Sequence, residues 1–177
     1  MGSMSVPLVV FLHGLGRTPQ FWQDQVSALP PGTRAVAPWL DGLRPGGSDG
    51  FELTRAADAV LGQLNRFGVD QVALVGSGLG ASVAVAAAGR SPAAVSHLVL
   101  TDLLPRTAKL AGGLQRLAVR AMPTAQLAEA GLDRGKMLAM MKASASVDLR
   151  ALLPQVTAQT LLLGGSGNPA GVTAARE

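Results

Sequence analysis

Short hydrophobic runs alternate with longer amphipathic stretches along the whole chain. The hydrophobic runs are rich in valine and leucine and are bounded by glycine, proline or polar residues, as buried strands are; they occupy 7–12, 33–40, 71–75, 97–101 and 160–164. Between these runs, apolar residues at helical spacing predict helices over 21–29, 51–68 and 79–89. Because strands alternate with helices, we predict an α/β fold with a mostly parallel sheet and flanking helices.

The pattern changes after the fourth predicted strand. Residues 103–150 contain no strand-like run and are predicted to form several short helices, which we interpret as a helical lid, or cap. The α/β core is accordingly expected to comprise residues 5–102 and 151–177. The last predicted helix has only its opening turn before Glu177, so we expect a C-terminally truncated core whose open sheet edge favours self-association.

Composition narrows the class of protein. The chain has 177 residues, of which 48% are hydrophobic, enough for one globular domain with a continuous core. Its apolar runs are too short to span a bilayer and its first residues lack a secretory signal, so we expect a cytoplasmic location and no membrane partner. The absence of cysteine excludes disulfides and thiolate chemistry, and no metal site is expected.

The net charge of +4 is concentrated in the predicted lid. Residues 103–150 carry eight basic and three acidic side chains, whereas the rest of the chain is slightly acidic. A positive patch can attract nucleic acid or anionic ligands. This segment has no aromatic residue to stack on bases, and its charges alternate with leucines at helical spacing. We therefore interpret it as a solvated helix face and expect no nucleic-acid partner.

A glycine-rich turn at 74–80, LVGSGLG, connects a predicted strand to a predicted helix. In one interpretation, Gly76, Gly78 and Ala81 form a dinucleotide-binding fingerprint, and Asp102 after the next strand is the ribose-binding carboxylate. In the other, residues 76–80 form a nucleophile elbow, G-x-S-x-G, with glycine in place of the serine. The fingerprint normally follows the first strand of its unit, whereas two predicted strands precede this turn.

Four segments in order resemble the α/β-hydrolase superfamily, particularly its small bacterial ester- and lactone-hydrolase-like members. VVFLHGLGRTPQFWQDQVSAL resembles the first conserved strand and its His-Gly oxyanion loop, and FELTRAADAVLGQL the helix before the elbow. VALVGSGLGASVAVAAAGRSPAAVSHLVLTD resembles the elbow, its helix and the next strand. DLRALLPQVTAQTLLLGGSGNPAGVTAARE resembles the return from the lid and the strand that bears the catalytic acid. The resemblance covers nearly the whole chain and implies an α/β-hydrolase-like sheet.

Carried over position by position, this resemblance implies that the catalytic unit is incomplete. The nucleophile position falls on Gly78, which has no side chain, and the acid position on Asn168, an amide. The catalytic histidine would follow a further strand, and the sequence ends before it. His13 belongs to the His-Gly loop, where a structural role is implied, and His97 begins a predicted strand at the rim of the sheet.

The same resemblance retains the groups that bind an oxyanion. The implied donors are the backbone N–H groups of Leu15 and Leu79, with Gly14 beside the first of them. Ser77 is interpreted as a small turn residue rather than a displaced nucleophile, and Asp102 as support for its loop. Lid methionines are expected to form an apolar roof or to pack in the core, namely Met122, Met137, Met140 and Met141.

These observations support three hypotheses. The leading one is an α/β-hydrolase-fold protein that is catalytically silent or uses its pocket for a small apolar or anionic ligand or for non-covalent chemistry, with no cofactor. A second is a truncated or altered form of a serine ester or lactone hydrolase. The third is a dinucleotide-binding Rossmann-type domain around 76–102.

Overall fold

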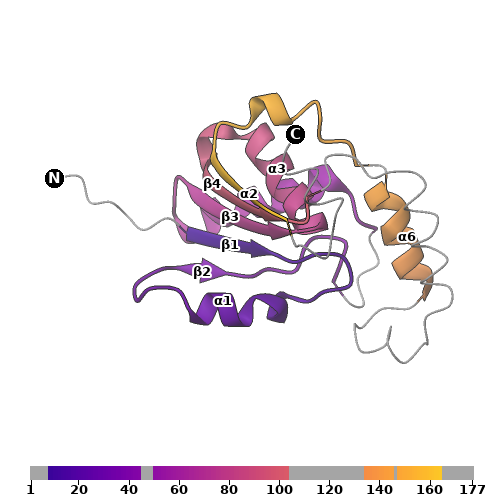
Figure 1. Ribbon diagram of the computed structural model, residues 1–177, viewed down its shortest axis with the longest axis horizontal. Coiled ribbons are helices and arrows are strands. Elements are labelled where there is room, and N and C mark those ends of the chain that lie inside the picture. The colour runs from indigo at the N-terminus through magenta and orange to yellow at the C-terminus, as the bar shows by residue number, and fades with distance from the viewer. Residues whose placement is uncertain (1–7, 45–49, 104–133, 146, 165–177) are drawn as a thin grey trace.

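The core of the protein is a five-stranded parallel sheet with strand order β2-β1-β3-β4-β5 (Figure 1). A computed structural model describes residues 8–44, 50–103, 134–145 and 147–164. Its strands are β1 Leu8–Leu12, β2 Ala35–Val36, β3 Val72–Ser77, β4 Val95–Thr101 and β5 Gln159–Leu163. The predicted α/β fold, with its parallel sheet and flanking helices, is confirmed.

Helices follow the strands as the alternation predicted. The α-helices are α1 Gln23–Ser27, α2 Leu53–Phe67, α3 Leu79–Arg90 and α6 Arg134–Ala145. Short 3₁₀ helices are η1 Pro19–Trp22, η2 Pro92–Ala94 and η3 Leu153–Gln155. No helix among the described residues is long and apolar enough to cross a membrane.

The main hydrophobic core lies between the sheet and the pair α2 and α3. Helix α3 is buried from Leu79 through Gly89, and its alanines and valines allow close packing against β1, β3 and β4. Helix α2 contributes one buried face, formed by Ala56, Ala57, Val60 and Leu64. Gly68 ends α2 in the left-handed conformation, with φ 61°, as its position in the sequence predicted.

The opposite face of the sheet is less completely covered. There Phe11 of β1 packs on Trp22 with ring centroids 5.4 Å apart, and Trp22 in turn contacts Phe21. Along β3 and β4, buried residues alternate with half-buried or exposed ones, since alternate side chains point to opposite faces. In β5 all five residues are exposed.

Two strand predictions differ from the structure in extent. The strand predicted over 33–40 is only two residues long, because just Ala35 and Val36 pair with β1 and Pro38 has no N–H for a ladder. Strand β3 instead continues beyond the predicted end to Ser77, which pairs with Thr101 of β4. Part of the glycine turn is therefore strand.

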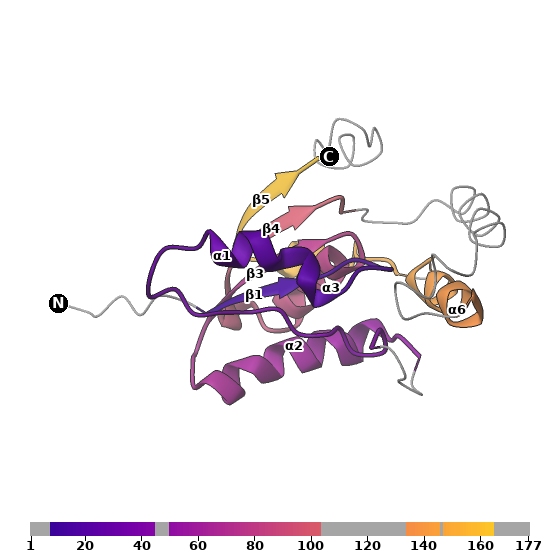
Figure 2. The ribbon, with the colours of Figure 1, turned by 90° about the horizontal axis from the view of Figure 1, so that it is seen from below.

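Helix α6 lies beyond the carboxyl ends of the strands in Figures 1 and 2. Its Met137 and Met141 are buried and belong to the same core as the sheet, together with Val147 and Leu149 just after it. Met122 and the rest of 104–133 lie outside the described residues. The boundaries of the lid, 103–150, remain a prediction.

Candidate functional site

The candidate site lies where the strand order reverses direction. From the centre of the sheet, β1 leads to β2 on one side, whereas β3 leads to β4 and β5 on the other. Strands β1 and β3 are parallel neighbours whose carboxyl ends meet, with Leu12 opposite Gly76. In open α/β sheets, ligands bind in the crevice outside the strands at such a switch point. The loops after β1 and β3 therefore carry the candidate site.

The turn after β3 has an unusual backbone at Gly78. This residue precedes α3 with φ 54° and ψ −114°, outside the regions that residues with a side chain favour. Its N–H donates a hydrogen bond of 2.9 Å to the carbonyl of Thr101 in β4, and its carbonyl accepts from the N–H of Ser82. A Cβ at position 78 would meet no atom within 4 Å. No packing contact therefore requires a glycine at this position, and a side chain would have free space there.

The glycines on either side of this turn are required by close contacts. A Cβ at Gly80 would lie 2.2 Å from the carbonyl oxygen of Leu12, and one at Gly76 would lie 2.6 Å from the carbonyl oxygen of Gly80. Both distances are far below van der Waals contact, so these glycines allow α3 to start directly against β1 and β3. This sharp strand-to-helix turn, with a strained central residue facing open space, is the geometry of a nucleophile elbow.

The loop after β1 packs against the elbow. A Cβ at Gly14 would lie 3.2 Å from the carbonyl oxygen of Ser77, so the two backbones are close neighbours. Leu15 follows in this loop, and Leu79 begins α3 on the other side. No described residue accepts a hydrogen bond from the backbone N–H of Leu15 or Leu79. Both predicted oxyanion donors therefore have unused hydrogen-bonding capacity at the switch point.

His13 is a buried structural residue in this geometry, with 0% of its surface exposed. Its Nε2 accepts from the N–H of Leu40 at 3.2 Å, so Nδ1 carries the proton and donates to the carbonyl of Gly14 at 3.0 Å. Its ring also makes an edge contact with Trp39, at 5.2 Å between centroids. Burial lowers the pKa of His13, and both ring nitrogens are occupied. It is therefore unable to act as a general base without breaking the contact between two loops.

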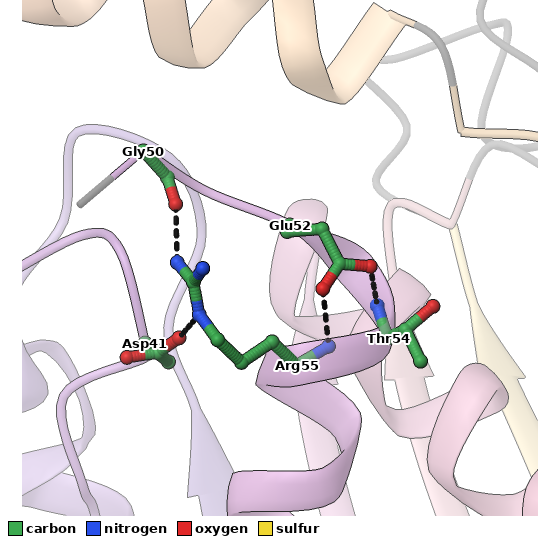
Figure 3. Close-up of polar contacts among 5 residues, drawn as sticks. All are labelled: Asp41, Gly50, Glu52, Thr54 and Arg55. Atoms are coloured by element: carbon green, nitrogen blue, oxygen red, sulfur yellow. Dashed lines mark hydrogen bonds and ion pairs between the residues drawn. The ribbon is translucent and has the colours of Figure 1, made fainter.

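The loop that His13 holds is tied in turn to α2 (Figure 3). Arg55 of α2 donates to the carboxylate of Asp41 and to the carbonyl of Gly50, one on each side of residues 45–49. Glu52 caps α2, since its two oxygens accept from the N–H groups of Thr54 and Arg55, each at 2.9 Å. These backbone bonds, chiefly that from Arg55, lower the pKa of the Glu52 carboxyl group. No local sequence signal indicated this support.

Helix α6 reaches the loop after β1 through Met137. The Cε of Met137 would lie 3.2 Å from a Cβ at Gly16, the residue next to Leu15, and Gly16 has φ 73°. A flexible, apolar methionine therefore packs over the loop that carries one of the two candidate donors. Met141 is also buried.

The remaining residues singled out from the sequence lie as follows. Ser77 is half-buried at the end of β3, on the same face as Ala73 and Val75, away from the core between the sheet and α3. Asp102 follows β4 with φ 53°, and among the described residues it is the one non-glycine residue with a positive φ. Asn168 lies outside the described residues.

The second histidine is remote from the elbow. His97 is exposed and contacts the hydroxyl of Ser96, with Nδ1 and Oγ 3.0 Å apart. It precedes Thr101 at the carboxyl end of β4 by four residues, about 13 Å along a strand. In the part of the chain that the structure describes, no three histidine, aspartate or glutamate side chains converge as metal ligands would.

Comparison with protein families gives a match over almost the whole chain. The model of the "Alpha/beta hydrolase family" matches residues 9–174, which include the elbow and the loop after β1. The resemblance noted in the sequence is thereby confirmed at the level of the family.

Individual relatives support the same assignment. A pimeloyl-[acyl-carrier protein] methyl ester esterase from Aromatoleum aromaticum is 36% identical over 102 residues, 58% of this chain. That match spans only 39% of the relative's length. NosK from Streptomyces actuosus has a TM-score of 0.75 at 26% identity, covering 97% of this chain and 81% of that one. The enol-lactonase from Burkholderia xenovorans LB400 has a TM-score of 0.76 at 18% identity, covering 97% and 79%.

Proposed function

The chain belongs to the α/β hydrolase family, and from that premise we propose that its elbow binds the carbonyl or carboxylate oxygen of a small, mostly apolar ligand without forming a covalent intermediate. One observation carries this proposal: Gly78 keeps the strained elbow backbone, φ 54° and ψ −114°, but provides no nucleophile. Acyl transfer through this position requires a side-chain oxygen or sulfur, which glycine lacks.

The ligand oxygen is held by two backbone donors in this proposal. The N–H of Leu79 lies at the N-terminus of a twelve-residue helix, α3, where the helix dipole favours negative charge. The N–H of Leu15 comes from the neighbouring loop, which Gly14 brings against Ser77. Neither donor depends on a side chain, so the glycine at 78 removes the nucleophile and leaves the donors.

Residues 103–150 would cover the ligand as a lid. The contact between Met137 and Gly16 supports this role, because it brings an apolar side chain of α6 to the loop of Leu15. Methionine adapts to ligands of different shape at little cost. A small acyl group is therefore the ligand class that this apolar surface favours.

A second candidate is an ester or lactone hydrolase altered at position 78. The open space around Gly78 favours it, since a serine side chain would meet no atom near its Cβ. The names of two relatives, a methyl ester esterase and an enol-lactonase, also favour this chemistry. Under this hypothesis, the protein lost its activity mainly because glycine replaced the nucleophilic serine at position 78. The general base that activates such a serine would then lie outside the described residues. His13 is committed to the N–H of Leu40 and is excluded as that base.

Hydrolysis of 4-nitrophenyl butyrate by the unmutated protein and by Gly78→Ser separates these candidates. The binding proposal expects no turnover above the buffer rate by either protein, because His13 is committed to its contacts with Leu40 and Gly14 and His97 is remote from the elbow. Turnover by Gly78→Ser alone would favour the altered hydrolase, and turnover by the unmutated protein would overturn both.

Binding is tested directly by the melting temperature in butyrate. A ligand at ten times its Kd stabilises the fold by about 1.4 kcal/mol, a rise of about 3–6 °C for a domain of this size. Gly78→Leu fills the open space at the elbow and is expected to abolish the rise. Gly62→Leu, on the exposed face of α2, is the matched control and is expected to retain it. An equal rise in both variants would rule out binding at the elbow.

A further inference from the structure

The segment after β2 connects the loop after β1 to helix α2 through three consecutive residues. The Trp39 ring makes an edge contact with the His13 ring, and the Leu40 N–H donates to Nε2 of His13 at 3.2 Å. The next residue, Asp41, pairs through its carboxylate with Arg55 of α2 (Figure 3). A movement of this segment relative to α2 would therefore displace the group that donates to His13.

Arg55 holds this segment at two points. Besides its bond to Asp41, it donates through Nη2 to the carbonyl of Gly50 at 2.5 Å. The turn that contains Asp41 is closed by a backbone hydrogen bond of 3.0 Å from the N–H of Leu43 to the carbonyl of Leu40. Arg55 thus binds the turn whose first residue supplies the N–H to the histidine.

The Leu40 N–H determines which nitrogen of His13 carries the proton. A backbone N–H can only donate, so Nε2 must accept, and the proton of the neutral ring lies on Nδ1. Nδ1 then donates to the carbonyl of Gly14 at 3.0 Å. In the other tautomer the lone pairs of Nδ1 and of this carbonyl oxygen would face each other, which is repulsive. The bond between His13 and Gly14 therefore depends on the donor at Leu40.

The carbonyl of Gly14 belongs to the same peptide unit as the N–H of Leu15. Because a trans peptide is planar, its C=O and N–H point in opposite directions. A Gly14 carbonyl held on His13 therefore directs the Leu15 N–H away from that ring. The N–H of Arg17 donates to the same carbonyl at 3.2 Å, so the turn of the loop and the histidine orient this peptide together.

We propose that Arg55 is a positioning residue for the backbone N–H of Leu15. It acts through the turn that begins at Leu40, which sets the tautomer of His13 and with it the direction of the peptide that carries this N–H. The use of the Leu15 N–H to bind a ligand oxygen rests on the proposed function. The effect of Arg55 on the peptide is independent of any ligand.

A second ion pair of α2 provides a matched control. Asp58 of α2 pairs with Arg90 of α3 at 2.8 Å, and within the described part of the chain neither side chain bonds to the turn that Arg55 holds. The side chains are similarly exposed, 45% for Arg55 and 40% for Arg90. Exposed ion pairs contribute little to stability, so Arg55→Gln and Arg90→Gln are both expected to fold and to change Tm only slightly.

Nitrogen NMR of the histidine rings at pH 7 measures the tautomer directly. The chain contains two histidines, His13 and His97, so a His97→Gln variant assigns their signals. The unmutated protein is expected to carry the proton on Nδ1 of His13. Arg55→Gln is expected to shift part of the population to the Nε2–H tautomer and to move the backbone amide signal of Leu15. Arg90→Gln is expected to change neither signal.

Asp41→Asn provides a second test of the same route, because it removes the charge that Arg55 binds at nearly constant shape. It is expected to reproduce the effect of Arg55→Gln on His13, and the double variant to show no further change. An unchanged His13 tautomer in Arg55→Gln and Asp41→Asn would overturn the proposal. An equal change in Arg90→Gln, or a Leu15 signal that stays in place while the tautomer changes, would also overturn it.

Titration with butyrate distinguishes this proposal from the proposed function. A misdirected Leu15 donor is expected to weaken the Kd about tenfold in Arg55→Gln, less than the about 10²–10³-fold loss typical of removing such a donor in catalysis. Arg90→Gln is expected to keep the Kd of the unmutated protein. A changed tautomer with an unchanged Kd in Arg55→Gln would overturn the positioning role. A lack of binding by the unmutated protein would refute the proposed function, and the NMR signals would still decide the role of Arg55.

Discussion

Replacing each of three glycines by alanine tests the elbow geometry independently of any activity. The chemical change is identical at Gly62, Gly78 and Gly80, but the surroundings differ. Gly62 lies on the exposed surface of α2 with no atom near its Cβ position. Gly78 also has open space but has φ 54°, and Gly80 faces the carbonyl oxygen of Leu12 at 2.2 Å.

The structure gives a different sign and size for each variant. Gly62→Ala is expected to raise the free energy of unfolding by about 0.5–1 kcal/mol, because alanine favours a helix. At Gly78 a side chain costs about 1–3 kcal/mol of backbone strain, offset by about 0.4–1 kcal/mol from a less flexible unfolded chain. Mid-range values of these two contributions leave a net loss of about 1–2 kcal/mol. At Gly80 backbone atoms must move, so a loss at the upper end of the about 1–3 kcal/mol typical of overpacking is expected.

Urea denaturation followed by circular dichroism measures all three variants on one scale. The Gly78→Ala loss corresponds to a fall of about 2–8 °C in Tm for a chain of this length. A Gly78→Ala variant as stable as the unmutated protein would refute the strained backbone at the elbow. A Gly80→Ala loss no larger than that of Gly78→Ala would refute the close approach of α3 to β1.

Three further predictions concern the surroundings of the site. Because burial lowers the pKa of His13, the folded protein is expected to lose stability as pH falls below about 6.5, the pKa of histidine in the unfolded chain; denaturation from pH 8 to 5 should show this, and His13→Gln should flatten the profile. Glu52→Gln is expected to lower Tm at pH 7, with the difference shrinking as pH falls through the lowered pKa of Glu52, because that carboxylate stabilises α2 only when ionised; an unchanged difference at pH 3 would contradict this. Asp102→Val should cost about 1–2 kcal/mol more than Asp102→Asn in urea denaturation, since asparagine tolerates φ 53° and valine does not.

Local sequence patterns predicted the elements that depend mainly on their own residues. Helix α2 illustrates this, since its apolar spacing and Gly68 predicted both its extent and its end. The strand before the elbow was also recognised, although pairing of Ser77 with Thr101 extends it. The strand expected over 33–40 failed because only Ala35 and Val36 find a partner in β1. The length of a strand therefore depends on how far it pairs with the neighbouring strand as well as on its own sequence.

In the candidate site, too, some features follow from the local sequence and others only from the tertiary structure. The three glycines of the elbow are visible in the sequence, but they are equivalent there. Only the tertiary structure separates Gly76 and Gly80, which are required by contacts with neighbouring backbone, from Gly78, which is distinguished by its dihedral angles. The contacts of His13 with Leu40 and of Met137 with Gly16 join residues far apart in the chain, so no local pattern could indicate them.

The sequence by itself therefore determined the α/β class, the order of the elements and the lack of a nucleophilic side chain at position 78. These follow from hydrophobic periodicity and from which side chains are present. The tertiary structure decided where position 78 lies in the sheet and which loop packs against it. It did so because close approach, burial and strand partners depend on residues that only folding brings together. The leucines of β5 illustrate this: the run TLLLG predicts a buried strand, whereas among the described residues only β4 pairs with β5 and all five of its residues are exposed.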